Sequence, residues 1–179
     1  MLKVKYLAAV SLLAMAAANT ATAADGTINF TGEIVANTCT IANNGNVTVT
    51  LPKISANHFT AGTERAGQTA FNIALSDCTP AEGTVAVRFT GDATQIDTIS
   101  GLFKNNSADA TPAKNVGVAV YDSADTLIKT AGNSSAPVDV AADGTASIPL
   151  TAWYQATTSG TPVTVGPVTA TGGIELVYN

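Results

Sequence analysis

The stretch GPVTATGGIELVYN, residues 166–179, decides the fold class of this chain. Ile174, Leu176 and Tyr178 occupy alternate positions, which is typical of a strand with one buried face. The sequence stops at Asn179, so no later strand follows to cover the edge of this one. Terminal residues usually fray unless they are tied down, and an uncovered apolar edge invites aggregation. We therefore expect a strand from another molecule to pair with this last strand.

The rest of the sequence is typical of an all-β protein. Of its 179 residues 46% are hydrophobic, enough for one domain with a sizeable core, and only 6% are aromatic. No stretch after residue 23 has a helical period, whereas short β-rich runs recur between Gly, Pro, Asn and Asp turns. The runs are FNIALSDC (71–78), TVAVRFTG (84–91), NVGVAVYD (115–122), TASIPLTAWYQA (145–156) and TPVTVGPVTA (161–170). We predict polar connections at 53–69 and 103–115, a tight turn at AADG (141–144) and a Greek-key β-sandwich.

The first 23 residues have the pattern of a signal peptide. A basic start, MLKVK, precedes an apolar run that is too short to span a bilayer, and ATA at 21–23 is a small-x-small cleavage signal. Cleavage is expected between Ala23 and Ala24; the alternative is a buried N-terminal helix. Losing Lys3 and Lys5 leaves six basic against thirteen acidic residues, a net charge of about −7. This charge argues against a nucleic-acid partner.

Two cysteines remain in the exported part of the chain, Cys39 and Cys78. In an oxidising compartment an even number with none left over favours one disulfide, which would close a loop of about 40 residues. The alternative, a metal pair, would need further ligands, and His58 is the only histidine. We predict no metal and no cofactor.

The sequence offers little for catalysis. It has no nucleophile elbow, zinc-protease, phosphate-loop or calcium-loop motif. His58 lies in a polar loop, and Asp122 and Asp125 read as a turn between strands. The sequence therefore lacks the set of catalytic residues that a secreted hydrolase would need. A secreted, monomeric carbohydrate-binding β-sandwich stays possible, and its aromatic platform would have to come from the residues Tyr121, Trp153 and Tyr154.

The segment DGTINFTGEIV, residues 25–35, has a period of two. One face would carry, in order, Gly26, Ile28, Phe30, Gly32 and Ile34. Taken alone, this alternation would suit a first strand that lies on its own sandwich. Together with a last strand that has no neighbour, it favours a segment that another molecule receives.

With these features, the chain resembles subunits of type 1-like fimbriae that are assembled by the chaperone/usher route. The resemblance covers the signal peptide, the GTINFTGEI extension, the cysteines of ANTCTI and FNIALSDC, and the terminal block. In that block the family places a glycine fourteen positions from the end and an aromatic residue at the penultimate position. Gly166 and Tyr178 stand there in this chain. One departure is the pair of glycines in TGGIELVY, which suggests that the last strand begins late or is soft.

The resemblance implies a structural protein rather than an enzyme. Its fold would be an incomplete immunoglobulin-like Greek-key sandwich that lacks its last strand and receives a donor strand from another subunit. Residues 24–35 would be the donor extension and 36–179 the pilin domain. The donated residues would be Gly26, Ile28, Phe30, Gly32 and Ile34. The groove and the chaperone-recognition end would comprise Gly166, Ile174, Leu176, Tyr178 and Asn179.

The implied partners are neighbouring pilin subunits, a periplasmic chaperone and an outer-membrane usher. The implied location is a fimbria on the bacterial surface, reached through the periplasm, where the fibre supports cell adhesion. A major rod subunit fits best, and a minor linker subunit of the same fibre is the alternative. A two-domain tip adhesin does not fit, because the chain is short and already begins with a donor segment.

Overall fold

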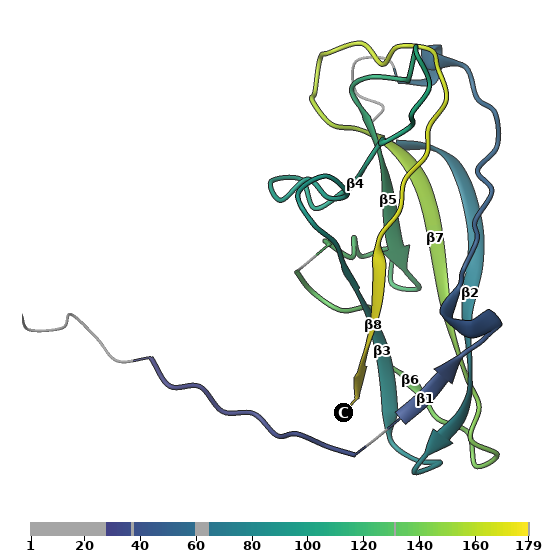
Figure 1. Cartoon of the computed structure of the whole chain (residues 1–179), viewed down its shortest axis with the longest axis vertical. Coiled ribbons are helices and arrows are strands. Elements are labelled where there is room, and N and C mark those ends of the chain that lie inside the picture. Colours follow the sequence, from purple (N-terminus) through teal and green to yellow (C-terminus); the bar gives the residue numbers. More distant parts are fainter. Residues whose placement is uncertain (1–27, 37, 60–64, 131, 179) are drawn as a thin grey trace, which may run out of the picture. The chain divides into compact units, whose positions relative to one another are not determined.

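The computed structural model describes residues 28–36, 38–59, 65–130 and 132–178. The chain divides after Val35, and the residues from Ala36 onward form the compact β domain drawn in Figure 1. Within the described ranges there is no α-helix, and two short 3-10 helices span Asn43–Gly45 (η1) and Ala56–His58 (η2). None of the helices in this part of the chain is long and apolar enough to cross a membrane. The predicted signal peptide and its cleavage site, Ala23 and Ala24, lie outside the described residues.

Two antiparallel sheets make up the domain. The larger has the order β1-β2-β7-β5-β4, formed by Thr38–Ile41 (β1), Arg65–Thr79 (β2), Ala146–Ala156 (β7), Val116–Asp122 (β5) and Phe103–Lys104 (β4). The smaller has the order β6-β3-β8, formed by Val138–Asp139 (β6), Thr84–Thr90 (β3) and Gly173–Tyr178 (β8). β1 and β8 are therefore edge strands of different sheets.

The core lies between these two sheets. Ile73 of β2, Ile148 of β7, and Val85 and Val87 of β3 are each at most 1% exposed. Burial of an aliphatic side chain of this size contributes roughly 1.5–3 kcal/mol. The alternation that the sequence shows in FNIALSDC and TVAVRFTG thus turns one face of each strand toward the other sheet. The prediction of an all-β sandwich is confirmed.

A disulfide joins Cys39 of β1 to Cys78 of β2. The two strands pair through Thr38 with Thr79 and Thr40 with Ser76, so the cysteines lie side by side. The predicted bond is confirmed, and the described residues contain no free cysteine. On the loop-entropy model a bridge of this length stabilises the fold by about 4 kcal/mol.

The strand predicted at residues 161–170 is wrong. No part of 161–172 belongs to a strand, although the segment is anchored along the connection 105–114. The backbone of Ala113 donates to the Pro167 carbonyl and that of Asn106 to Thr169, at 3.1 and 2.8 Å. Pro162 and Pro167 have no N–H to give to a ladder, which explains why β-branched residues here do not form a continuous strand.

The predicted polar connection 53–69 is also too long, because β2 begins at Arg65. Register against β7 shifts between Ala66 and Thr69, and Gly67 has a φ of +74° there. The shift is a β-bulge, and Gly67 has there a backbone conformation that few residues other than glycine adopt. The tight turn predicted at 141–144 is confirmed, since Ala141 accepts from Gly144 and donates to Thr145.

Candidate functional site

β8 forms one wall of the candidate site. It pairs with β3 through six residues, from Gly173 opposite Thr90 to Tyr178 opposite Val85. Its other edge has no strand partner among the described residues. Ile174, Leu176 and Tyr178 are half-buried and pack against the core, so the predicted alternation is present. β8 therefore offers a row of backbone groups beside a partly covered apolar surface.

The two glycines before β8 have a packing role. A Cβ at Gly172 would collide with the ring of Phe103, and one at Gly173 would come within 2.6 Å of the Thr90 hydroxyl. The chain therefore approaches β4 and β3 more closely than a side chain would allow. The strand begins at Gly173, in agreement with the late start that these glycines suggest.

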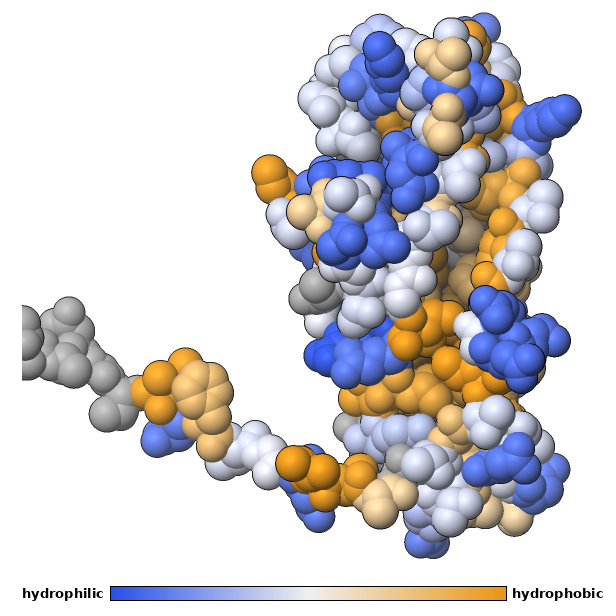
Figure 2. Space-filling view, in the orientation of Figure 1, coloured by the Kyte–Doolittle hydropathy of each residue, from blue (hydrophilic) through white to orange (hydrophobic). Residues whose placement is uncertain are grey.

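The second wall is residues 46–54, which the sequence reasoning missed. This segment belongs to no strand, yet Val47, Val49 and Leu51 are half-buried while the residues between them are exposed. The signal was present as a period of two in NVTVTL, residues 46–51. In Figure 1 the segment runs along the domain on the side toward β2, while 163–178 runs in front of β5 and β3. Figure 2 shows apolar surface exposed between them.

A cavity of about 440 Å³ opens between the two walls. Lys53 and Ile54 line it from one wall and residues 163–168 from the other, with Ala113, Val116 and Tyr154 also lining it. Gly166 lies at this cavity with a φ of +150°, and a Cβ there would collide with the Thr111 carbonyl. We call the region between residues 46–54 and 163–178 the groove. Gly166 lies toward one end of it and Tyr178 toward the other.

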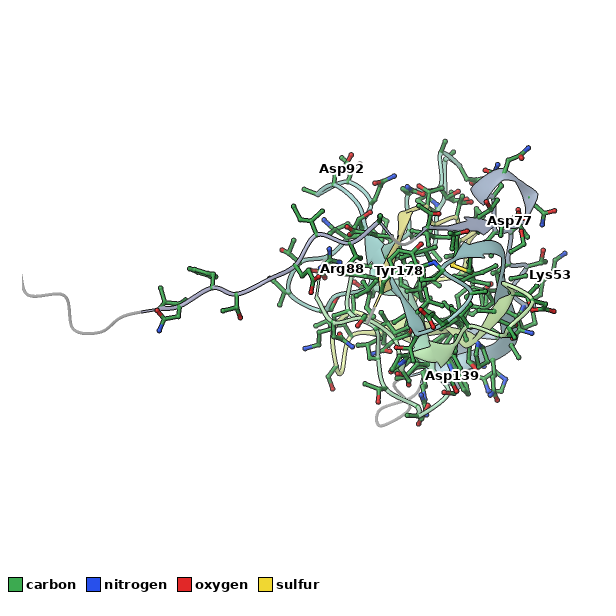
Figure 3. All side chains as sticks on the ribbon, turned by 90° about the horizontal axis from the view of Figure 1, so that it is seen from below. Lys53, Asp77, Arg88, Asp92, Asp139 and Tyr178 are labelled. Atoms are coloured by element: carbon green, nitrogen blue, oxygen red, sulfur yellow. A yellow bond between two sulfur atoms is a disulfide. The ribbon has the colours of Figure 1, made fainter. Side chains whose placement is uncertain are left out.

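Tyr178 closes the end of the groove opposite the cavity. Its hydroxyl accepts a hydrogen bond of 2.8 Å from the backbone N–H of Cys39. This bond joins the end of β8 to β1, the edge strand of the other sheet, beside the disulfide. In Figure 3 Tyr178 lies within the outline of the domain. Asn179 lies outside the described residues.

The N-terminal segment 28–35 has no regular secondary structure. Ile28, Phe30 and Ile34 are 76%, 84% and 101% exposed, and an added Cβ at Gly32 would meet nothing within 4 Å. Three large apolar side chains at alternate positions are thus available to a partner. Gly26, the first of the predicted donor residues, lies outside the described residues.

A salt bridge joins β3 and β8, which are neighbouring strands of the smaller sheet. The guanidinium of Arg88 on β3 contacts the carboxylate of Glu175 on β8 at 2.7 Å, and these residues are direct partners in the register. Opposite charges at facing positions stabilise an antiparallel pair modestly. The pair supports the register that directs Ile174 and Leu176 toward the core.

The three aromatic residues that could have formed a carbohydrate platform do not share one surface. The guanidinium of Arg65 lies over the rings of Tyr121 and Trp153, 4.5 and 4.6 Å from their centroids. Arg65 also binds Asp125 at 2.7 Å, and its hydrogen bond lowers the pKa of that carboxyl group. Tyr154 follows Trp153 on the strand, lines the cavity instead, and has a pKa raised by burial.

The residues that were considered as catalytic candidates are not gathered into one site. The Asp122 carboxylate accepts hydrogen bonds from the backbone N–H groups of Ala124 and Thr126, so it holds the turn predicted from the sequence. His58 is exposed at the end of η2. Among the residues that the structure describes, no three His, Cys, Asp or Glu side chains gather as a metal site would require.

Comparison with known proteins points to one family. A family model described as "Fimbrial protein" matches residues 28–179. The major fimbrial subunit SMF-1 of Stenotrophomonas maltophilia is 36% identical over 168 residues, covering 89% of this chain and 95% of that protein. The type-1 fimbrial protein A chain of Salmonella typhi is 34% identical over 140 residues, 76% of this chain and 75% of that one.

A solved structure agrees with the architecture. A subunit from the structure of a chaperone-usher pilus superposes with a TM-score of 0.59 at 20% identity, covering 87% of this chain and 96% of that one. At this identity the likeness shows the fold alone. This shared fold agrees with the predicted immunoglobulin-like sandwich that lacks a strand.

Proposed function

The chain belongs to the fimbrial protein family, the structural, non-enzymatic subunits of chaperone-usher pili on the bacterial surface, and we propose that it is a major rod subunit that polymerises by donor-strand exchange. The extension at residues 24–35 enters the groove of the neighbouring subunit. Before that, a periplasmic chaperone occupies the groove and an outer-membrane usher exports the subunit. The resulting fibre supports adhesion of the cell.

One observation carries the proposal: the same chain has an open groove and an exposed segment that suits it. The groove has two edges without strand partners among the described residues, and its surface is apolar. The segment presents Ile28, Phe30 and Ile34 at alternate positions. Addition of a strand between two edges would satisfy backbone groups on both sides. Each large side chain would contribute roughly 1.5–3 kcal/mol on burial.

The direction of insertion follows from the requirement that the fibre continue. Each subunit's own extension leaves its domain through β1, which lies at the Tyr178 end of the groove. An incoming domain at that same end would compete with this extension for space. A head-to-tail polymer therefore requires the incoming domain at the cavity end. Ile34, close to its own domain, then enters the cavity, and Gly26 lies toward Tyr178.

This direction makes the incoming strand antiparallel to β8. Residues 26–34 would extend about 30 Å at roughly 3.3 Å per residue, a length that residues 166–178 can match. Gly32 would lie next to Ile34, at a position where the groove would have to accept no side chain.

Replacing residues 26–34 with a Gly/Ser segment of equal length tests the proposal. The variant keeps the reach of the extension but loses all the large apolar side chains, so we expect periplasmic subunit and no surface fibre. Electron microscopy of the cells and immunoblotting of sheared fibres provide the measurement. Normal fibres from this variant would show that the segment is not the polymerisation element.

A further inference from the structure

One basic residue lines the cavity, and a second is next to a cavity residue in the sequence. The described residues include six basic side chains, of which Arg65 and Arg88 already bind Asp125 and Glu175. Lys53 lines the cavity and is exposed, and in Figure 3 it lies at the periphery of the domain. Lys114 follows the cavity residue Ala113 and is also exposed. Neither lysine forms an ion pair with the part of the chain that the structure describes.

The extension carries one acidic residue in its described part, Glu33. It is exposed and lies between Gly32 and Ile34. Because successive side chains of a strand point to opposite faces, Glu33 would point to solvent when Ile34 enters the cavity. It would then lie beside the wall that carries Lys53.

Alternation by itself leaves the register of the inserted strand open. A slip of one residue would turn Ile28, Phe30 and Ile34 outward, but a slip of two keeps the apolar face inward. Such a slip would bring Thr31 or Val35 to the position of Glu33, and neither side chain is charged. Only one register therefore places a carboxylate next to Lys53.

We propose that Glu33 of the incoming subunit forms an ion pair with Lys53 of the accepting subunit, and that this pair selects the donor register. The inference rests on the proposed donor-strand exchange. The subunits have a net charge of about −7 after export, so two copies repel each other as they approach. Lys53 of the accepting subunit attracts Glu33, the residue that precedes Ile34 in the incoming strand. The ion pair mainly affects the register in which the strand is inserted and the rate of assembly.

Charge reversal at the two positions tests the pair. Glu33→Lys and Lys53→Glu should each lower the yield of sheared surface fibre about threefold to tenfold, because each places like charges side by side. The double variant restores opposite charges in every joint and should return the yield to within about twofold of the original. If the fold-loss of fibre yield in the double variant equals the product of the two single fold-losses, the proposed ion pair does not form.

Lys114→Glu is the matched control, because it makes the same change of net charge at an exposed residue that follows the cavity residue Ala113. Combined with Glu33→Lys it should give no recovery. If Lys114→Glu restored the fibre yield of Glu33→Lys as fully as Lys53→Glu does, the recovery would come from general charge attraction. That result would contradict a specific pair between Glu33 and Lys53. Should Lys53→Glu fail to accumulate in the periplasm, the neutral variants Glu33→Gln and Lys53→Gln supply the same double-mutant cycle. Fibres that form with the Gly/Ser extension would instead contradict donor-strand exchange itself.

Discussion

Phe30→Asp is expected to abolish polymerisation while leaving the subunit folded and bound to its chaperone. Phe30 is 84% exposed and takes no part in the core, so its replacement removes nothing that the domain requires. In the neighbouring groove, however, the new carboxylate would be buried without a partner. Loss of the phenyl contact costs roughly 1.5–3 kcal/mol, and burial of the charge adds several more. At 1.4 kcal/mol for each factor of ten, the joint would weaken more than a hundredfold.

Asn29→Asp is the matched control for this result. It introduces the same charge one position away, on the face that would point to solvent, so fibres should form almost normally. The two variants are compared by the periplasmic yield of the chaperone complex and by the amount of surface fibre. If the segment were the first strand of the subunit's own sandwich, Phe30→Asp would unfold the monomer. Loss of the chaperone complex in Phe30→Asp would therefore contradict the proposal.

Deletion of Tyr178 and Asn179 is expected to remove the subunit from the periplasm. The truncation shortens β8, eliminates the pairing of Tyr178 with Val85, and breaks the hydrogen bond to the Cys39 backbone. It also removes the end at which we propose that the chaperone holds its client. With both β8 and the groove weakened, the chain should be degraded before export. Immunoblotting of periplasmic extracts provides the measurement, and normal fibres would refute this role of the terminus.

Tyr178→Phe separates the hydroxyl group from the rest of the terminus. It leaves the ring and the backbone in place but removes the acceptor for the Cys39 N–H. An unsatisfied, partly buried donor costs about 1–3 kcal/mol. The subunit should therefore accumulate with reduced stability, in contrast to the truncated chain.

The sequence predicts those elements of the fold in which each strand repeats one simple pattern. In β2, β3, β5 and β7 every second residue faces a common core, so alternation alone identifies them. The two cysteines identify their own bond because they are the only pair. The alternation of Ile174, Leu176 and Tyr178 predicts β8. The close approach of Gly172 to Phe103 and of Gly173 to Thr90 is seen only in the structure.

The second wall of the groove could not be predicted as easily. Residues 46–54 alternate like a strand, yet they have no strand partner among the described residues, and their position beside 163–168 depends on contacts distant in sequence. Residues 161–170 mislead in the opposite way, since β-branched residues suggest a strand that Pro162 and Pro167 interrupt. Both segments border the groove, where the local sequence pattern and the backbone pairing within the described chain disagree.

A cryo-electron microscopy map of the assembled fibre tests the central claim most directly. We expect residues 26–34 of one subunit to form a strand between β8 and residues 46–54 of its neighbour. It should run antiparallel to β8, with Ile34 in the cavity beside Gly166 and Gly26 toward Tyr178. A map in which this segment pairs within its own domain, or in which another element fills the groove, would contradict donor-strand exchange as the basis of this fibre.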